Sequence, residues 1–156
     1  SNSNLSTKIF TFVTKDITFG NINVRKKVYG IYITYRVRET EGTRTNIDSG
    51  VKVVAATNGS NDFDDSSGEG VAFSTSSKFA FGQSVTAADG STQTTCYGSS
   101  TLDETDGIWK TAHLKPVTSS KLNNITSIML HFSGASVPYD FEINDISIIY
   151  RNKSLK

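Results

Sequence analysis

The sequence is poor in residues that cross-link a chain or interrupt its secondary structure. Its 156 residues include one cysteine, one methionine, one tryptophan and two prolines. Cys96 therefore has no partner for a disulfide within the chain, and cysteine usage indicates no redox compartment. A chain of this length needs no cross-link, because folding buries roughly 68–70% of the surface that the unfolded chain exposes.

A large excess of charge and a long apolar run are also missing. Sixteen Lys and Arg residues stand against fifteen Asp and Glu residues, for a net charge of +1, which argues against a strongly basic nucleic-acid-binding protein. No apolar run approaches the roughly 20 residues of a membrane helix, and no stretch resembles a secretory signal. We expect no nucleic-acid partner and no membrane insertion.

Alternation of apolar and polar residues is present almost everywhere, whereas the helical period of 3.6 is hard to find. The clearest stretches are "KVYGIYITYRV" at 27–37 and "NITSIMLHFSG" at 124–134. The residues expected on their core faces are Tyr29, Ile31, Ile33, Tyr35 and Val37 in the first stretch, and Ile128, Leu130 and Phe132 in the second. An aspartate at Ile31 or Ile33 should therefore unfold the domain.

Three local signals punctuate the pattern. Asn58-Gly59 suits a tight hairpin turn because both residues tolerate positive φ. Pro116 should end the strand before it, since proline lacks the donor that a ladder needs. In "YDFEINDISIIYR" the apolar face changes parity between Ile143 and Ile146, which predicts a β-bulge near Asn144-Asp145.

Eight or nine short strands separated by turns, with no defensible helix, predict an all-β fold. We expect a two-sheet antiparallel β-sandwich of jelly-roll type. Residues 1–7 read as a polar linker from a longer parent chain, and residues 8–156 as a single β-sandwich domain.

Cations gather at both ends of the stretch "VRKKVYGIYITYRVR", with Arg25, Lys26 and Lys27 at its start. A nucleic-acid platform would need exposed aromatics beside them, but the tyrosines share a face with isoleucines. Solvated strand ends, which discourage edge pairing, are the better interpretation. On this basis Lys26→Ala should change stability by no more than roughly 0.5 kcal/mol.

The loop "NDFDDSSGEG" carries clustered carboxylates that could serve calcium, which takes six to eight oxygen ligands. The spacing fits no EF-hand, and "LDETDG", with Asp103, Glu104 and Asp106, is a second acidic loop of the same kind. The alternative is that both acidic loops are simply solvated and bind no metal ion. Calcium is the one cofactor that the sequence leaves open, with Asp62, Asp64, Asp65 and Glu69 as its candidate ligands.

Catalytic motifs are not recognisable. His113 and His131 fall in predicted strands without zinc-ligand spacing, and no G-x-S-x-G elbow occurs. Glu142 and Asp145 are the tempting carboxylate pair for glycoside hydrolysis, but their place beside the expected bulge favours a structural role. We expect no enzyme and assign no catalytic residue.

Aromatic residues near the acidic loops offer a carbohydrate-binding alternative. An exposed Trp109 could stack on a sugar ring, and Phe63 and Tyr97 have similar loop-like contexts. A core position between the sheets is nevertheless the favoured interpretation of Trp109. The sequence thus leaves Phe63, Tyr97 and Trp109 as candidate glycan-binding residues.

Four segments together resemble a known group of proteins: "DITFGNINVRKKVYGIYITYR", "VKVVAATNGS", "IWKTAHLKP" and "VPYDFEINDISIIYRNKSLK". They are similar to the C-terminal domain of virion structural proteins of short-tailed bacteriophages, of nozzle, tail-tubular or stabilisation type, from marine or environmental phages. The resemblance runs from residue 8 to residue 156 and thins over 61–106. The final "RNKSLK" looks like a true C-terminus with a basic tail.

The resemblance implies a non-catalytic domain in the tail of a virion, packing or presenting surface loops. Its implied partners are other virion subunits, in a homo-oligomer formed through the parent chain. A host-surface glycan is the alternative ligand, which the aromatic residues suggest and the resemblance does not. Arg25, Lys26 and Lys27 are then candidate contacts with a neighbouring subunit.

Overall fold

The structure is a computed structural model, and it describes residues 7–37, 50–73, 78–80, 85–86, 92–93, 109–138 and 141–154. These residues form strands and one short 3-10 helix, η1. The strands are β1 (Thr7–Val13), β2 (Lys26–Val37), β3 (Gly50–Thr57), β4 (Val71–Ala72), β5 (Lys78–Ala80), β6 (Val85–Thr86), β7 (Thr92–Gln93), β8 (Lys110–Leu114), β9 (Ile128–Pro138) and β10 (Phe141–Asn152), and η1 spans Ser119–Leu122.

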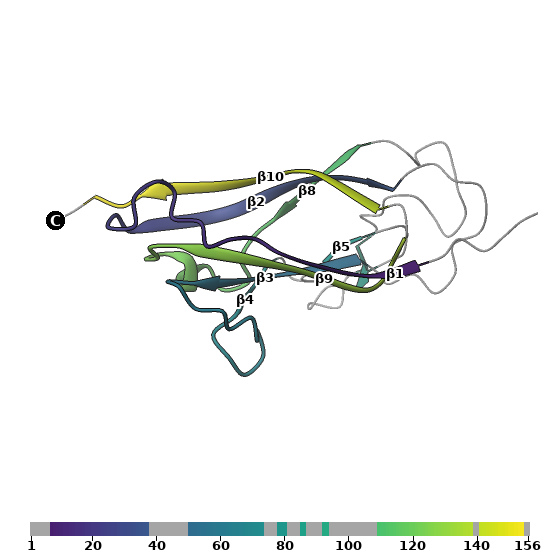
Figure 1. Ribbon diagram of the computed structural model, residues 1–156, viewed down its shortest axis with the longest axis horizontal. Coiled ribbons are helices and arrows are strands. Elements are labelled where there is room, and N and C mark those ends of the chain that lie inside the picture. Colours follow the sequence, from purple (N-terminus) through teal and green to yellow (C-terminus); the bar gives the residue numbers. More distant parts are fainter. Residues whose placement is uncertain are drawn as a thin grey trace, which may run out of the picture.

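Two antiparallel sheets face each other (Figure 1). One has the order β1-β9-β3-β4, with β5 also paired to β3, and the other has the order β10-β2-β8. The all-β, two-sheet antiparallel sandwich expected from the alternating pattern is confirmed, whereas the jelly-roll strand order stays a prediction. No helix among the described residues is long and apolar enough to cross a membrane.

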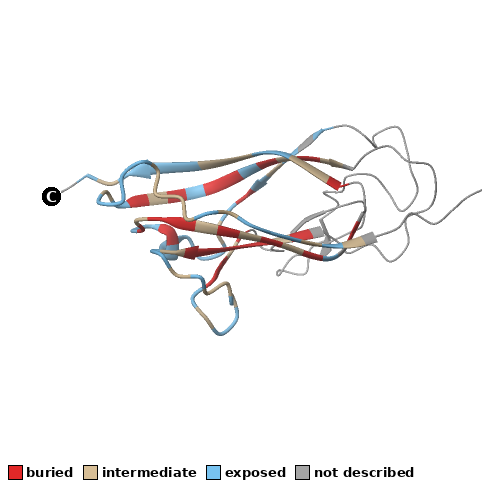
Figure 2. Cartoon of the chain, viewed as in Figure 1, coloured by how far each residue is buried: buried red, intermediate tan, exposed pale blue. Residues whose placement is uncertain are grey.

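The core lies between the facing sides of the two sheets, where Figure 2 shows the buried residues. Ile31 and Ile33 of β2 and Ile128, Leu130 and Phe132 of β9 are all 0% exposed. These core positions are confirmed. Full burial of apolar side chains of this size is the main source of the fold's stability.

The bulge in β10 is also confirmed. The antiparallel register moves from Ile143 opposite Tyr35 to Asp145 opposite Thr34, so Asn144 is an extra residue. One extra residue reverses the face that follows. This is why Ile143 and Ile146 both pack against the core despite their odd spacing.

A second bulge, in β2, corrects the expected facing of Tyr29. Gly30 pairs with Ile149 while Val28 pairs with Tyr150, which leaves Tyr29 without a partner in the register. Val28 is buried and Tyr29 is 41% exposed. The prediction that Tyr29 belongs to the core row is therefore wrong, because the extra residue turns its side chain outward.

The turn at Asn58-Gly59 has the expected backbone but not the expected hairpin. Asn58 and Gly59 have φ values of 56° and 80°, and the Ser60 amide donates to the Thr57 carbonyl at 3.0 Å. The chain does not return at once to the sheet, because β4 begins only at Val71. A long loop, residues 58–70, therefore separates the two strands.

Lys26 is the largest departure from the sequence-based expectation. Its side chain is 0% exposed, and its Nζ donates to the carbonyl oxygens of Thr18 at 2.8 Å, Thr126 at 3.0 Å and Asn21. Burial lowers the pKa of Lys26 below its ordinary value of 10.5. The surface position predicted for Lys26 is wrong, and a buried ammonium group cannot reach a neighbouring subunit.

Candidate binding surfaces

The acidic loop, residues 58–70, lies against the outer side of the β1-β9-β3 sheet. The Phe63 ring packs on the His131 ring of β9, with centroids 5.0 Å apart. The Asp65 carboxylate accepts a hydrogen bond from Lys52 Nζ of β3 at 2.8 Å. One aromatic contact and one ion pair thus attach the loop to the sheet.

The carboxylates of Asp62 and Asp64 accept hydrogen bonds from within the acidic loop. Asp62 accepts the amides of Asp64 and Glu69, both at 3.0 Å. Asp64 accepts the amides and the hydroxyls of Ser66 and Ser67, at 2.6–3.1 Å. Within the described ranges, no three His, Cys, Asp or Glu side chains form a group that could hold a metal ion; calcium binding by Asp62, Asp64, Asp65 and Glu69 stays a prediction.

These hydrogen bonds predict how the acidic loop responds to pH. The Ser67 hydroxyl and then the Ser66 amide lower the pKa of Asp64, and the Glu69 and Asp64 amides lower the pKa of Asp62. Depressed carboxyl pKa values stabilise the fold above their unfolded value of 3.8, and this contribution is lost as pH falls through the folded values.

We therefore expect the Ser66, Ser67 and Glu69 amide resonances to be constant from pH 7 to about pH 4 and to move below that value. Two-dimensional NMR of the chain measures this directly. Asp64→Asn is the matched variant, because it removes the charged acceptor and should shift the Ser66 and Ser67 amides already at pH 7. Movement of these resonances centred between pH 5 and 6 would contradict the assignment.

Trp109 lies outside the core, on the opposite sheet. It directly precedes β8 and is 40% exposed, so the interpretation that buries it between the sheets is wrong. The guanidinium carbon of Arg36 lies 4.3 Å from the centroid of the indole ring. Arg36 Nε in turn donates to Glu142 Oε2 at 2.7 Å, so an ion pair orients the cation that stacks on Trp109.

A second aromatic pair lies further along the same face. Tyr32 of β2 and His113 of β8 are cross-strand partners, and their rings stack with centroids 4.1 Å apart and an interplanar angle of 9°. The imidazole lies against Gly30, where a Cβ atom would be 3.0 Å from His113 Nε2. The missing side chain at Gly30 therefore leaves room for His113 to lie over the sheet.

Strand register places these groups in rows across the outer side of the β10-β2-β8 sheet. Glu142 and Arg36 form one row beside Trp109, and the stacked pair Tyr32 and His113 forms another with Ser147. Between them runs a polar row. We call this outer side the aromatic face and define it by Trp109, Arg36, Glu142, Asp145, Thr34, Thr111, Ser147, Tyr32 and His113.

The proposed glycan-binding residues do not form one site. Phe63 contacts His131 on the outer side of the β1-β9-β3 sheet, whereas Trp109 contacts Arg36 on the outer side of the β10-β2-β8 sheet. Phe63 and Trp109 therefore lie on opposite outer sides of the sandwich, and glycan binding by either residue stays a prediction. Tyr97 lies outside the described residues, as do Asp103, Glu104 and Asp106.

Glu142 and Asp145, the carboxylate pair considered for glycoside hydrolysis, each accept a hydrogen bond from a nearby side chain. Glu142 accepts the Arg36 hydrogen bond, and Asp145 accepts one from the Ser147 hydroxyl at 2.9 Å. They stand on either side of the bulged residue Asn144. A structural role for both carboxylates stays a prediction.

Two of the three cations at the start of β2 remain at the surface. Arg25 is exposed and its Nη1 donates to the Asn124 carbonyl at 3.4 Å. Lys27 is half-buried, with its Nζ 5.0 Å from the centroid of the Tyr29 ring. Contact of Arg25 and Lys27 with a neighbouring subunit stays a prediction.

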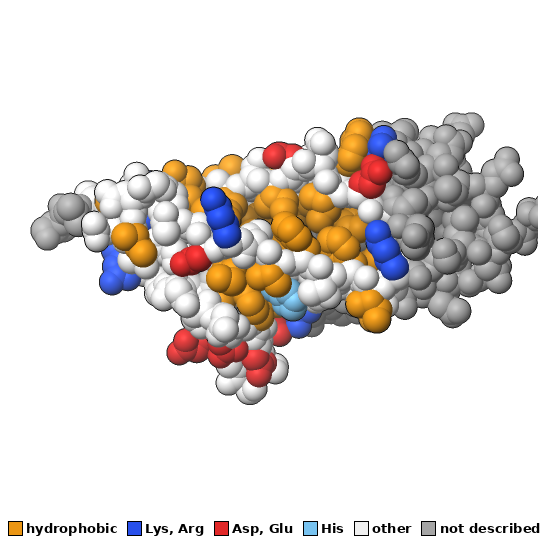
Figure 3. Space-filling view, viewed as in Figure 1, with side chains coloured by type: hydrophobic (Ala, Val, Ile, Leu, Met, Phe, Trp, Pro, Cys, Tyr) orange, Lys and Arg blue, Asp and Glu red, His pale blue; other side chains and the backbone are white. Residues whose placement is uncertain are grey.

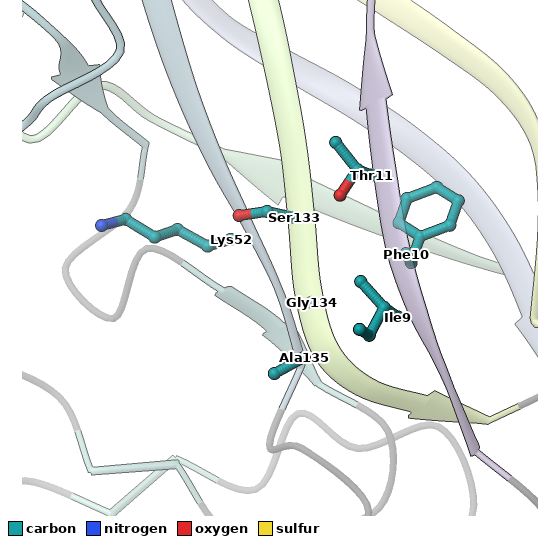
Figure 4. A pocket seen from close by; sticks show the side chains of 7 residues that line it. All are labelled: Ile9, Phe10, Thr11, Lys52, Ser133, Gly134 and Ala135. Carbon is teal, nitrogen blue, oxygen red and sulfur yellow. The ribbon is translucent and has the colours of Figure 1, made fainter.

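Two hollows flank strand β1. The first, on the outer side of its sheet, is about 380 Å³ and is lined by Ile9, Phe10, Thr11, Lys52, Ser133, Gly134 and Ala135. Figure 4 shows the side chains of Lys52 and Phe10 pointing in opposite directions across this hollow. The Lys52 ammonium group already pairs with Asp65, which reduces its capacity to bind an anion here.

The second hollow lies along the open side of the sandwich, between β1 and β10. It is about 440 Å³ and is lined by Phe10 and Phe12 of β1 and by 143–146 of β10. Figure 3 shows hydrophobic side chains gathered in a strip on this side of the molecule. We call it the apolar strip and define it by Phe10, Phe12, Ile143 and Ile146.

The geometry thus defines a class: a β-sandwich domain with an aromatic face on one sheet and an apolar strip along its open side. No protein-family model, curated protein or solved structure matches the chain.

Proposed function

We propose that this chain is a non-catalytic interaction domain of a phage tail protein, which packs against another copy of itself through the apolar strip. The apolar strip is the observation that carries the proposal. The virion setting rests on the resemblance of the segments at 16–36, 51–60, 108–116 and 137–156 to tail structural proteins.

The apolar strip has the character of a contact surface. Phe12 is 45% exposed although its ring packs on the core residue Phe132, with centroids 5.8 Å apart. Phe10 meets Phe141 of the other sheet edge-on at 5.2 Å, so aromatic side chains from both sheets line this side. Contiguous exposed apolar surface of this kind marks interaction sites on soluble proteins.

The strands beside the apolar strip also favour a partner there. In the sheet orders of the described strands, β1 and β10 each have a neighbour on one side only. An edge strand exposes backbone donors and acceptors that another chain can pair with. Virion components are commonly symmetric homo-oligomers, in which one surface meets the same or another surface of an identical chain.

Self-association of the purified chain tests this packing. We expect sedimentation velocity to show association that increases with concentration, and Phe12→Ser to weaken it by roughly tenfold or more, the scale of losing one anchoring side chain. Ile9→Ser is the matched control, because Ile9 lies on the same strand, is 81% exposed and lies outside the apolar strip. A wild-type chain that stays monomeric, or equal effects of the two variants, would reject packing through this strip.

The virion setting is tested by a separate experiment. Antibodies raised against the purified chain should label the tails of the phage particles that encode it in negative-stain electron micrographs. Label confined to capsids, or particles that contain none of the chain, would reject the tail assignment whatever the sedimentation result.

A further inference from the structure

We propose that the aromatic face binds an extended, uncharged glycan, with Trp109 and the Tyr32–His113 pair as two stacking platforms. This inference rests on the proposed function, because it supplies the ligand that a tail interaction domain would recognise. It uses the outer side of the β10-β2-β8 sheet and leaves the apolar strip free for packing.

The first platform is an indole ring held in place from one side. The Arg36 guanidinium covers Trp109 at 4.3 Å while Glu142 fixes that guanidinium at 2.7 Å. Trp109 nevertheless remains 40% exposed. A pyranose ring has an apolar face of C–H groups that packs against the electron-rich face of an aromatic ring, and a ring oriented in advance loses little entropy when it binds.

The distance between the second platform and the first is about the length of a short oligosaccharide. Trp109 and His113 are four positions apart along the chain, which is roughly 13 Å at ~3.3 Å per strand residue. Tyr32 is 38% exposed although one side of its ring stacks on His113. A single sugar cannot reach both platforms, so the spacing favours a chain of sugars laid along β8.

Hydroxyl and carboxylate groups occupy the polar row between the two platforms. Thr34 and Thr111 are cross-strand partners whose Oγ1 atoms lie 3.5 Å apart, and Asp145 is opposite Thr34 on the other side. These groups donate and accept hydrogen bonds in the way that sugar hydroxyls require. Polar groups placed between aromatic surfaces fix the orientation of a ligand whose stacking supplies affinity.

Charge and polarity select among the ligand classes. The aromatic face carries two carboxylates, Glu142 and Asp145, against the single guanidinium of Arg36, which Glu142 already pairs. A phosphate backbone needs unpaired cations along its track. An uncharged glycan does not.

The test uses the intact chain, displayed in many copies so that a weak single site becomes detectable. The probe is a glycan array that carries uncharged and acidic bacterial polysaccharides together with cellohexaose and chitohexaose. Glycans that bind are then titrated into the monovalent chain. Trp109 is the only tryptophan in the sequence, so the change in intrinsic tryptophan fluorescence reports on the site itself.

We expect an uncharged glycan to bind with a saturable change in Trp109 fluorescence. Tyr32→Ala and, measured by calorimetry, Trp109→Ala should each weaken binding roughly tenfold or more, the scale of removing one stacking platform. Phe63→Ala is the matched control, because it breaks an equivalent aromatic–histidine contact, Phe63–His131, on the opposite side. It should leave the dissociation constant unchanged, and thermal melts confirm that the three variants fold.

Binding of acidic glycans alone, binding of none, or binding that survives both Tyr32→Ala and Trp109→Ala would overturn the inference. Loss of binding in Phe63→Ala with full binding in Trp109→Ala would also overturn it, since the site would then be beside the acidic loop. Tail labelling and self-association are measured separately. A failure of glycan binding is therefore distinguishable from a failure of the proposed function.

Discussion

Lys26→Met should destabilise the folded chain by roughly 2–4 kcal/mol, the cost of leaving buried acceptors without a charged donor. Methionine keeps an unbranched apolar side chain of similar length, so the loss reports mainly on the ammonium group. Its three N–H donors meet the carbonyls of Thr18, Asn21 and Thr126 in the folded chain.

Two opposing effects decide the sign of this change. Burying an ammonium group is costly, as the lowered pKa of Lys26 indicates, so its removal recovers desolvation energy. The Thr18 and Thr126 carbonyls then lose this donor, whereas the carbonyl of the exposed Asn21 also accepts the Val24 amide at 3.4 Å. Each unsatisfied buried acceptor costs about 1–3 kcal/mol, so with two such acceptors against one cation the loss should dominate.

The Lys26 ammonium group adds to backbone contacts between the segments that it joins, in which Ile17 and Ile128 exchange hydrogen bonds at 2.8 and 3.0 Å. Thr18 and Asn21 lie in the connection between β1 and β2, whereas Thr126 lies directly before β9. The same connection includes Phe19 at a φ of 57°, a left-handed conformation that costs roughly 1–3 kcal/mol in a bulky residue. Without the Lys26 hydrogen bonds, this connection should relax.

Thermal unfolding measures the effect of Lys26→Met. We expect the midpoint to fall by roughly 4–16 °C, from the usual relation between stability and melting temperature at this chain length. Lys27→Met is the matched control. Because the Lys27 ammonium group lies over the half-exposed Tyr29 ring, its loss should cost no more than about 1 kcal/mol. Equal midpoints for the two variants would show that the buried cation has no special role.

The contrast between the two bulges shows what the sequence can predict. Around Asn144 the apolar residues Ile143 and Ile146 change parity, so the bulge could be inferred from the pattern. Around Tyr29 the sequence is Val-Tyr-Gly-Ile, and both Val28 and Tyr29 are plausible core residues. Tyrosine tolerates either side of a strand and glycine has no side chain, so the pattern conceals the change of face.

Lys26 was missed for a different reason. A buried lysine is rare unless its charge is satisfied, and the groups that satisfy this one come from positions 8, 5 and 100 residues away. Backbone carbonyls carry no sequence signature. Only the assembled fold brings the three of them around one ammonium group.

Trp109 did have a local signal. In "WKTAHL" the residues Ala112 and Leu114 alternate as a core face, which places Trp109 on the same side as the polar Thr111 and His113. The structure has Leu114 buried and Thr111 exposed. Strand parity therefore predicts an outward Trp109, whereas the general tendency of a lone tryptophan to be buried does not.

Ile33→Asp should leave the chain largely unfolded at room temperature. Ile33 is 0% exposed and occupies the centre of the three-stranded sheet, opposite Ile146 of β10 and Ala112 of β8. An aspartate there places a carboxylate among apolar side chains without a partner, which costs roughly 4 kcal/mol or more. The whole stability of a domain is commonly only about 5–15 kcal/mol.

Two further variants isolate the cause of this loss. Ile33→Val keeps the position apolar and should cost about 0.5–1.5 kcal/mol. Thr111→Asp adds the same charge to the exposed outer side of the same sheet, where it should cost no more than roughly 1 kcal/mol. Circular dichroism and urea unfolding distinguish the three variants. The opposite outcome, in which Ile33→Asp folds and Thr111→Asp does not, would contradict this assignment. It would mean that Ile33 faces solvent and that the side called the aromatic face is the core.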